Sequence, residues 1–102
     1  MNWTVRYLRK AEEDLRRLDG SVSREVRKAI EKLKTDPENL GKALGHKQVD
    51  LTGLREVKLR KAGIRIIYNV RRTESSLLIV VVGFRADDEV YKIADRRMKD
   101  LC

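Results

Sequence analysis

The stretch that decides the fold runs from Glu56 to Tyr68 and reads EVKLRKAGIRIIY. Apolar and polar residues alternate on both sides of Ala62-Gly63, which is the pattern of two β-strands joined by a tight turn. Glycine readily adopts the positive φ that such a turn needs. We therefore predict a β-hairpin with strands over residues 54–61 and 64–72.

A two-residue turn at 62–63 sets the expected register of this hairpin. It places Lys58 opposite Ile67 and Arg60 opposite Arg65, because the residue numbers of every cross-strand pair then add up to the same value. One face is expected to be apolar and to contact helices; it comprises Val57, Leu59, Ile64, Ile66, Tyr68 and Val70. The other face is mostly basic and comprises Glu56, Lys58, Arg60, Arg65 and Ile67.

Like charges on that second face have two interpretations. An arginine directly opposite another costs roughly 0.2–1 kcal/mol through repulsion, and a bound anion such as phosphate would reverse that cost. Alternatively, the charges solvate a strand and prevent edge-to-edge aggregation. The hairpin by itself favours neither interpretation.

Two more strands are expected outside the hairpin. Trp3, Val5 and Tyr7 alternate with polar residues, as in a half-buried strand. Residues 77–82 read LLIVVV, an unbroken apolar run that is typical of a strand covered on both faces. This run is therefore expected at the centre of the sheet.

Helical periodicity appears in three segments, and a segment without periodicity separates the second from the hairpin. The first helix begins near Arg9, and Gly20 is expected to end it. Ser21 is expected to cap the second helix, and Asp87 or Asp88 the last one. Residues 38–53 are expected to form a long ordered loop, either a plain connector or a loop that contacts a substrate.

Length and charge restrict the class of protein. A chain of 102 residues with 41% hydrophobic and 39% charged residues is expected to form a single domain with a modest core. The 24 Lys and Arg against 16 Asp and Glu give a net charge of +8, which favours a polyanionic partner such as nucleic acid. With Cys102 as its only cysteine and no apolar run long enough to cross a membrane, the protein is expected to be cytoplasmic.

Two residues after the central strand are candidates for a functional site. Arg85 follows the strand directly, where side chains often point into a cleft, and could contact phosphate. Tyr91 lies in the first turns of the last helix and could stack on a base. The alternatives are a surface ion pair of Arg85 with Asp87 or Asp88, and ordinary packing for Tyr91.

In its order of elements, and in the segments LREVKLRKAGIRIIYNV and VVVGFRADDEVYKIADRR, the sequence resembles the RelE/ParE superfamily of bacterial toxins, and most closely its RelE branch. The resemblance covers nearly the whole chain. It implies one α+β domain over residues 1–102, in which a small twisted antiparallel sheet carries two N-terminal helices on one face and a further helix at the C-terminus.

The resemblance also implies a function. A RelE-like chain is expected to be the toxin of a type II toxin–antitoxin system, to cut messenger RNA on the ribosome and so inhibit translation, and to be silenced by an antitoxin. No cofactor or metal is implied. The alternatives are a ParE-like inhibitor of DNA gyrase without nuclease activity, and a catalytically weakened homologue that binds RNA or an antitoxin.

Carried across residue by residue, the resemblance implies a catalytic lysine at Lys58, a phosphate-binding arginine at Arg65, a second catalytic arginine at Arg85 and a base-stacking tyrosine at Tyr91. The family has a further catalytic lysine two residues before Lys58, where this chain has Glu56. Neighbouring basic residues are additional candidates for RNA contact; they are Arg55, Arg60 and Lys61.

The reaction that the resemblance implies is attack of a ribose 2′-hydroxyl on the adjacent phosphate, which gives a 2′,3′-cyclic phosphate. It needs a base, a group that stabilises charge and a proton donor, and His46 is the only histidine. Lys58 could be the base if Arg60 and Arg65 favour its neutral form, which Glu56 opposes. A second hypothesis makes Glu56 the base, and a third makes it a structural partner of Lys58 or Arg60.

Overall fold

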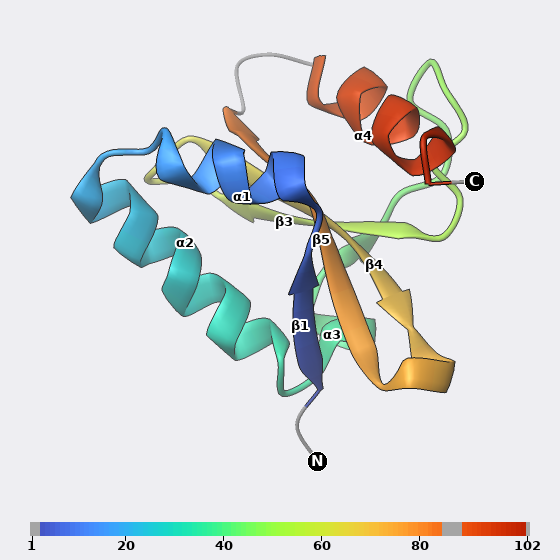
Figure 1. The fold of residues 1–102 in the computed structure, drawn as a ribbon, viewed down its shortest axis with the longest axis horizontal. Coiled ribbons are helices and arrows are strands. Elements are labelled where there is room, and N and C mark those ends of the chain that lie inside the picture. Colours follow the sequence, from blue (N-terminus) through green and yellow to red (C-terminus); the bar gives the residue numbers. More distant parts are fainter. Residues whose placement is uncertain (1–2, 85–88, 102) are drawn as a thin grey trace.

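The computed structural model describes residues 3–84 and 89–101. Five strands form one sheet in the order β1-β5-β4-β3-β2, with helices on both faces (Figure 1). The strands are β1 (Thr4–Tyr7), β2 (Lys42–Ala43), β3 (Leu54–Leu59), β4 (Ile64–Arg71) and β5 (Ser76–Phe84). The helices are α1 (Arg9–Arg16), α2 (Gly20–Leu33), α3 (Pro37–Leu40) and α4 (Glu89–Lys99), with a short 3-10 turn at Arg72–Glu74. The expected α+β class is confirmed.

The central strand is β5, as the LLIVVV run predicts. It pairs with β4 in antiparallel orientation and with β1 in parallel, so the sheet is mixed and not wholly antiparallel as expected. Residues 76–82 are all buried because α1 and α2 cover one face of the strand and α4 covers the other. None of the described helices is long and apolar enough to span a bilayer.

Each face of the sheet has its own apolar core. The first core lies under α1 and α2 and includes Ala11, Leu15, Val26, Ile30, Leu33, Ile64, Ile66, Tyr68, Leu77 and Ile79. The second core lies under α4 and the segment 44–51 and includes Leu44, Leu51, Leu54, Ile67, Leu78, Val80, Val90, Tyr91 and Ala94. The predicted apolar face of the hairpin is confirmed, since all six of its residues belong to or contact the first core.

The boundary between α1 and α2 differs from its expected position. Gly20 is the first residue of α2 and does not end α1, which already stops at Arg16. The N-cap of α2 is Asp19, whose carboxylate accepts the backbone N–H of Val22 at 3.0 Å and the hydroxyl of Ser21 at 2.9 Å. A carboxylate at this position satisfies an otherwise unpaired helix N–H, so Ser21 supports the cap and does not form it. The caps expected at Asp87 or Asp88 lie outside the described residues.

The hairpin register differs from the expected one by two residues. Lys58 pairs with Arg65, where the sequence-based register placed Arg60. The turn spans residues 60–63, and the N–H of Gly63 donates to the carbonyl of Arg60 at 3.3 Å. Two-residue turns need a positive φ at their first residue, here Ala62, which a side chain disfavours; only Gly63 in this turn has a positive φ, at 68°. A cross-strand pair of like charges is therefore still present, but it consists of Lys58 and Arg65 and not of Arg60 and Arg65.

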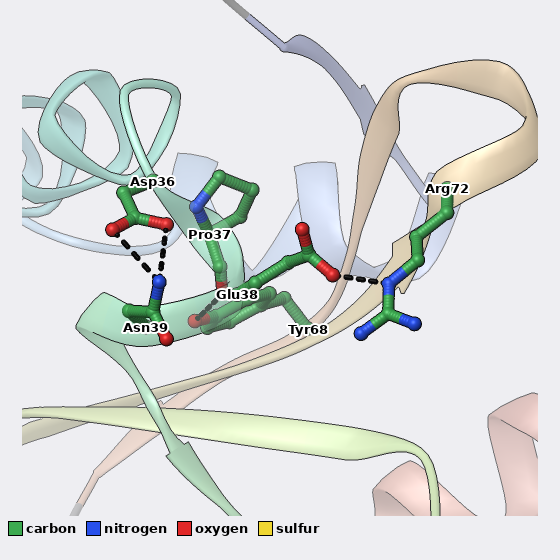
Figure 2. A network of polar contacts seen from close by, with 6 residues as sticks. All are labelled: Asp36, Pro37, Glu38, Asn39, Tyr68 and Arg72. Atoms are coloured by element: carbon green, nitrogen blue, oxygen red, sulfur yellow. Dashed lines mark hydrogen bonds and ion pairs between the residues drawn. The ribbon is translucent and has the colours of Figure 1, made fainter.

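Residues 38–53 contain more structure than the expected loop. The short helix α3 is held against the sheet by two contacts (Figure 2): the Tyr68 hydroxyl donates to the Pro37 carbonyl at 2.7 Å, and Glu38 forms an ion pair with Arg72. The strand β2 follows and pairs with β3 at the sheet edge. Its brevity, at two residues, explains why no period is visible in the sequence.

A partly buried ion pair joins the two faces of the molecule at the edge of β5. The carboxylate of Asp14 in α1 binds the guanidinium of Arg97 in α4 through two contacts, at 2.8 and 3.2 Å. The same carboxylate accepts the N–H of Val82 at 3.1 Å, and Arg97 donates to the carbonyl of Val80 at 2.8 Å. These two side chains therefore form hydrogen bonds with backbone groups at the edge of β5 beyond the point where β1 ends.

Candidate functional site

A small cationic pocket lies on the second face of the sheet, where Tyr91 of α4 contributes to its lining. Its volume is about 240 Å³, and it is lined by Lys47, Gln48, Lys58, Arg65 and Tyr91. Lys58 on β3 and Arg65 on β4 are direct cross-strand partners, so the sheet itself holds the two cations side by side. We refer to these five residues as the cationic pocket.

A buried carboxylate lies behind the pocket. Glu56 is 4% exposed, and one of its oxygens, Oε1, accepts the Tyr91 hydroxyl at 2.9 Å. The same oxygen lies 3.5 Å from Nε of Arg65. A buried carboxylate is costly unless it is paired and hydrogen-bonded, and these two contacts meet that need. They also fix the positions of Arg65 and Tyr91 relative to each other.

Tyr91 contacts cations from two elements. The guanidinium carbon of Arg65 lies 5.2 Å from the centre of its ring, and Nζ of Lys47 lies 5.8 Å from it, both within the range of cation–π attraction. The residue is only 6% exposed. The ring therefore has little free surface for the base stacking that the sequence suggested, and in this arrangement it positions the two cations.

The position of Glu56 bears on its three hypothetical roles. The expected structural partners were Lys58 or Arg60, whereas its observed partners are Arg65 and Tyr91. Glu56 does not line the pocket, and Lys58 does. Lys58 is exposed and makes no ion pair within residues 3–84 and 89–101. Among the described side chains, Lys58 is thus better placed than Glu56 to contact a bound substrate.

The remaining candidates do not all converge on this pocket. Arg60 and Lys61 lie in the exposed turn between β3 and β4, away from the residues that line it. Arg55 points to the opposite face of β3, where its guanidinium donates to the carbonyl of Gly41. Arg85 lies outside the described residues, so its predicted role remains a prediction.

Lys47 and Gln48 are pocket residues that sequence reasoning missed. They come from the segment 38–53, whose sequence has no period and fits either a plain connector or a substrate-contacting loop. Their exposure alone gives no signal, because charged and polar loop residues are common. A usable signal would have been the apolar residues Leu44 and Leu51 on either side of them, both of which are buried in the second core.

The cationic pocket is not the largest depression on the surface. A groove of about 600 Å³ between β1 and α2 is lined by Trp3, Thr4, Val5, Tyr7, Arg27, Ile30, Glu31 and Lys34. Its charges are mixed, and Lys34 is already paired with Glu31 at 3.1 Å. None of the candidate site residues that the structure describes lines this groove. In the described part of the chain, no group of three or more His, Cys, Asp or Glu side chains could hold a metal ion.

Comparisons with known proteins agree with this fold. Residues 5–89 match the family model described as the ParE toxin of the type II toxin–antitoxin system parDE. A putative RelE-like toxin protein from Escherichia coli is 26% identical over 102 residues, covering 97% of this chain and all of the relative. A variant of the E. coli toxin RelE in its free state is similar in structure, with a TM-score of 0.81, 23% identity and coverage of 96% of this chain and 99% of that one.

A second similar structure comes from a complex. The toxin–antitoxin complex RelBE2 from Mycobacterium tuberculosis contains a chain with a TM-score of 0.72 and 24% identity, covering 83% of this chain and all of that one. At these identities the two structures establish the fold, and the family model extends over most of the chain. Similarity to the RelE-like relative and the shared fold of RelE agree with the family model. This chain therefore belongs to the ParE toxin family of type II toxin–antitoxin systems.

Proposed function

We propose that this toxin is an endoribonuclease that cuts messenger RNA on the ribosome, and that the cationic pocket binds the phosphate at the cut. The observation that carries the proposal is the convergence of Lys58 and Arg65 with Lys47 in one pocket. The carboxylate of Glu56, which lies behind these cations, is already engaged by Tyr91 and Arg65. Such a site attracts a phosphodiester and stabilises the additional negative charge of its transition state.

The proposed reaction is internal transesterification of RNA. A ribose 2′-oxygen attacks the adjacent phosphorus, its proton passes to a base, the bond from phosphorus to the 5′-oxygen breaks, and that oxygen takes up a proton. The products are a 2′,3′-cyclic phosphate and a 5′-hydroxyl. In this proposal Arg65 binds the phosphate oxygens, because a guanidinium can donate to two of them at once.

Lys58 is the proposed proton-transfer residue, since it lines the pocket and Glu56 does not. Glu56 acts as a positioning residue that orients Arg65 and Tyr91. Arg85 keeps the role of a second catalytic arginine that the family resemblance implies. Because the chain's only histidine, His46, is exposed and lies outside the pocket, the proposal assigns no histidine to proton transfer.

The proposal includes two kinds of partner. One is the ribosome with its messenger RNA, which a surface of net charge +8 would attract in a salt-dependent way. The other is an antitoxin, because the matching family consists of toxins from toxin–antitoxin systems and a similar chain is found in the M. tuberculosis complex. Cytoplasmic action is part of the same proposal.

The test is primer-extension mapping of a messenger RNA in a bacterial translation extract that contains the purified toxin. We expect breaks at fixed positions relative to codons, and no breaks when ribosomes are removed. Lys58→Ala and Arg65→Ala should each reduce the rate about 100-fold or more, which is the usual effect of losing a proton-transfer group or a charge-stabilising donor.

Lys28→Ala is the matched control, because Lys28 is an exposed lysine on α2, over the other face of the sheet. It should cleave at the wild-type rate. Intact messenger RNA together with inhibited supercoiling by DNA gyrase would overturn the proposal in favour of a ParE-like inhibitor. Breaks that persist without ribosomes would overturn the dependence on them.

A further inference from the structure

The segment between Leu44 and Leu51 is a tight, well-anchored loop. Both leucines are buried in the second core, and Val49 packs against it. Backbone hydrogen bonds close the loop: the N–H of Leu51 donates to the carbonyl of Gly45 at 2.8 Å, and the N–H of Lys47 donates to that of Val49 at 3.0 Å. The base of the loop is therefore fixed to the sheet, although its tip is exposed.

The tip of the loop lies over the cationic pocket. Lys47 and Gln48 are both exposed, and both line the pocket. Gln48 adopts a φ of 67°, in the left-handed region that non-glycine residues rarely occupy. The hydrogen bonds and apolar anchors of the loop hold this conformation. A strained backbone that places a polar side chain at a pocket is a recurring feature of binding sites.

Charge adds a second, independent observation. Lys47 makes no ion pair within the described residues, and its ammonium group lies 5.8 Å from the centre of the Tyr91 ring. Arg65 contacts the same ring. Lys47 therefore adds a cation to the pocket from outside the sheet, beside the pair that β3 and β4 hold together.

We infer that the tip of this loop is part of the RNA-binding site: Lys47 binds the phosphate backbone of the nucleotide in the pocket, and Gln48 contacts its base. This inference rests on the proposed function and extends it. An ammonium group recognises phosphate regardless of sequence, whereas a glutamine amide donates and accepts hydrogen bonds and can distinguish the edges of different bases. The loop therefore determines which nucleotide the pocket prefers.

The test measures binding of fluorescein-labelled RNA hexamers by fluorescence anisotropy. The four probes are homopolymers of A, C, G and U with 2′-O-methyl groups, which prevent cleavage. Lys47→Ala should weaken all four probes about equally, by roughly 5–10-fold, and should lower the slope of log affinity against log salt by about 0.7, the value for one lost phosphate contact on a single strand. Gln48→Ala should leave the salt slope unchanged and reduce the differences among the probes.

Three reference proteins make the result decisive. Lys28→Ala should match the wild type, and Lys58→Ala and Arg65→Ala should weaken all four probes. If those two variants weaken binding while Lys47→Ala and Gln48→Ala match Lys28→Ala, the loop inference is wrong and the proposed function stands. If Lys58→Ala and Arg65→Ala also bind like the wild type, both fail. Thermal melting of each variant confirms folding, and a loop variant that melts like the wild type while losing binding supports the inference.

Discussion

Tyr68 on the first face of the sheet and Tyr91 on the second are both buried, but their hydroxyl groups have different partners. The Tyr68 hydroxyl donates to a backbone carbonyl, that of Pro37, and burial raises the pKa of this tyrosine. The Tyr91 hydroxyl donates to the carboxylate of Glu56, which also contacts Arg65. One tyrosine thus holds a helix in place, and the other organises charges next to a pocket.

The two faces differ in the same way. The first core is covered by two amphipathic helices, α1 and α2, and consists of apolar side chains. The second is covered by one helix and a short loop, which leave room for the cationic pocket. The comparison teaches that the second face combines packing with the cationic pocket. A substitution on the first face should therefore change stability and spare RNA binding, whereas one beside the pocket can change both.

The largest expected effect comes from the ion pair that joins the faces. Asp14→Ala leaves the partly buried Arg97 guanidinium without its carboxylate and leaves the Val82 N–H without its side-chain acceptor. Breaking a fully buried pair from one side costs about 3–5 kcal/mol, so for this partly buried pair we expect a loss of about 2–3 kcal/mol of unfolding free energy. Urea denaturation monitored by circular dichroism measures this loss of stability.

The conservative variant Asp14→Asn keeps one acceptor oxygen, which can still accept the Val82 N–H and one N–H of Arg97, and should lose less than Asp14→Ala. If Asp14→Ala unfolded in two separate transitions, the two faces would be independent folding units. If it were as stable as the wild type, the ion pair would not join them energetically. Either result would require a revision of the comparison between the faces.

Substitution of the two tyrosines should have an intermediate effect on stability. It also tests the comparison between the two faces most directly. Tyr68→Phe and Tyr91→Phe each remove one buried hydroxyl, with an expected loss of about 1–2 kcal/mol of unfolding free energy. Only Tyr91→Phe should also weaken binding of the RNA hexamers, by a few-fold, because Arg65 loses a fixed neighbour. Denaturation and anisotropy on the same two variants provide the measurements.

Equal RNA binding by both tyrosine variants would show that Tyr91 does not position the pocket. Weaker binding by Tyr68→Phe would show that the first face contributes to the site after all. Each variant serves as the control for the other, because they differ in face and not in the group removed.

The smallest expected effect concerns the cap of α2, on the first face. The backbone N–H of Val22 and then the hydroxyl of Ser21 hold the pKa of Asp19 below its usual range. Because the folded-state pKa is lower than the unfolded one, the contribution of Asp19 to stability is complete above the unfolded value and is lost as the pH falls through the folded value.

Asp19→Asn retains a cap that does not titrate. Thermal melting should show the wild type slightly more stable than the variant at about pH 6, and this difference should shrink as the pH falls through the lowered folded-state pKa of Asp19. A constant difference across this range would mean that the charge of Asp19 plays no part. RNA binding should be the same in both proteins, since the cap lies away from the pocket.

Local residue patterns were sufficient to predict the elements that form one helix face or one strand. The LLIVVV run identified β5 as the central strand, and alternation identified the apolar face of the hairpin, because period and burial are properties of consecutive residues. Charge spacing brought Lys58 and Arg65 into one region before their exact pairing was known. These predictions depend on short-range sequence alone.

Features that depend on contacts between distant segments were decided by the tertiary structure. The register that pairs Lys58 with Arg65 follows from the four-residue turn, since Ala62 cannot readily take the φ of a shorter one. The partners of Glu56 follow from α4 folding back over β3, which brings Tyr91 within hydrogen-bonding distance across 35 positions of sequence. Lys47 reaches the pocket only because Leu44 and Leu51 are buried under the same helix. The sequence therefore determined which residues share a face, whereas long-range packing decided which side chains meet.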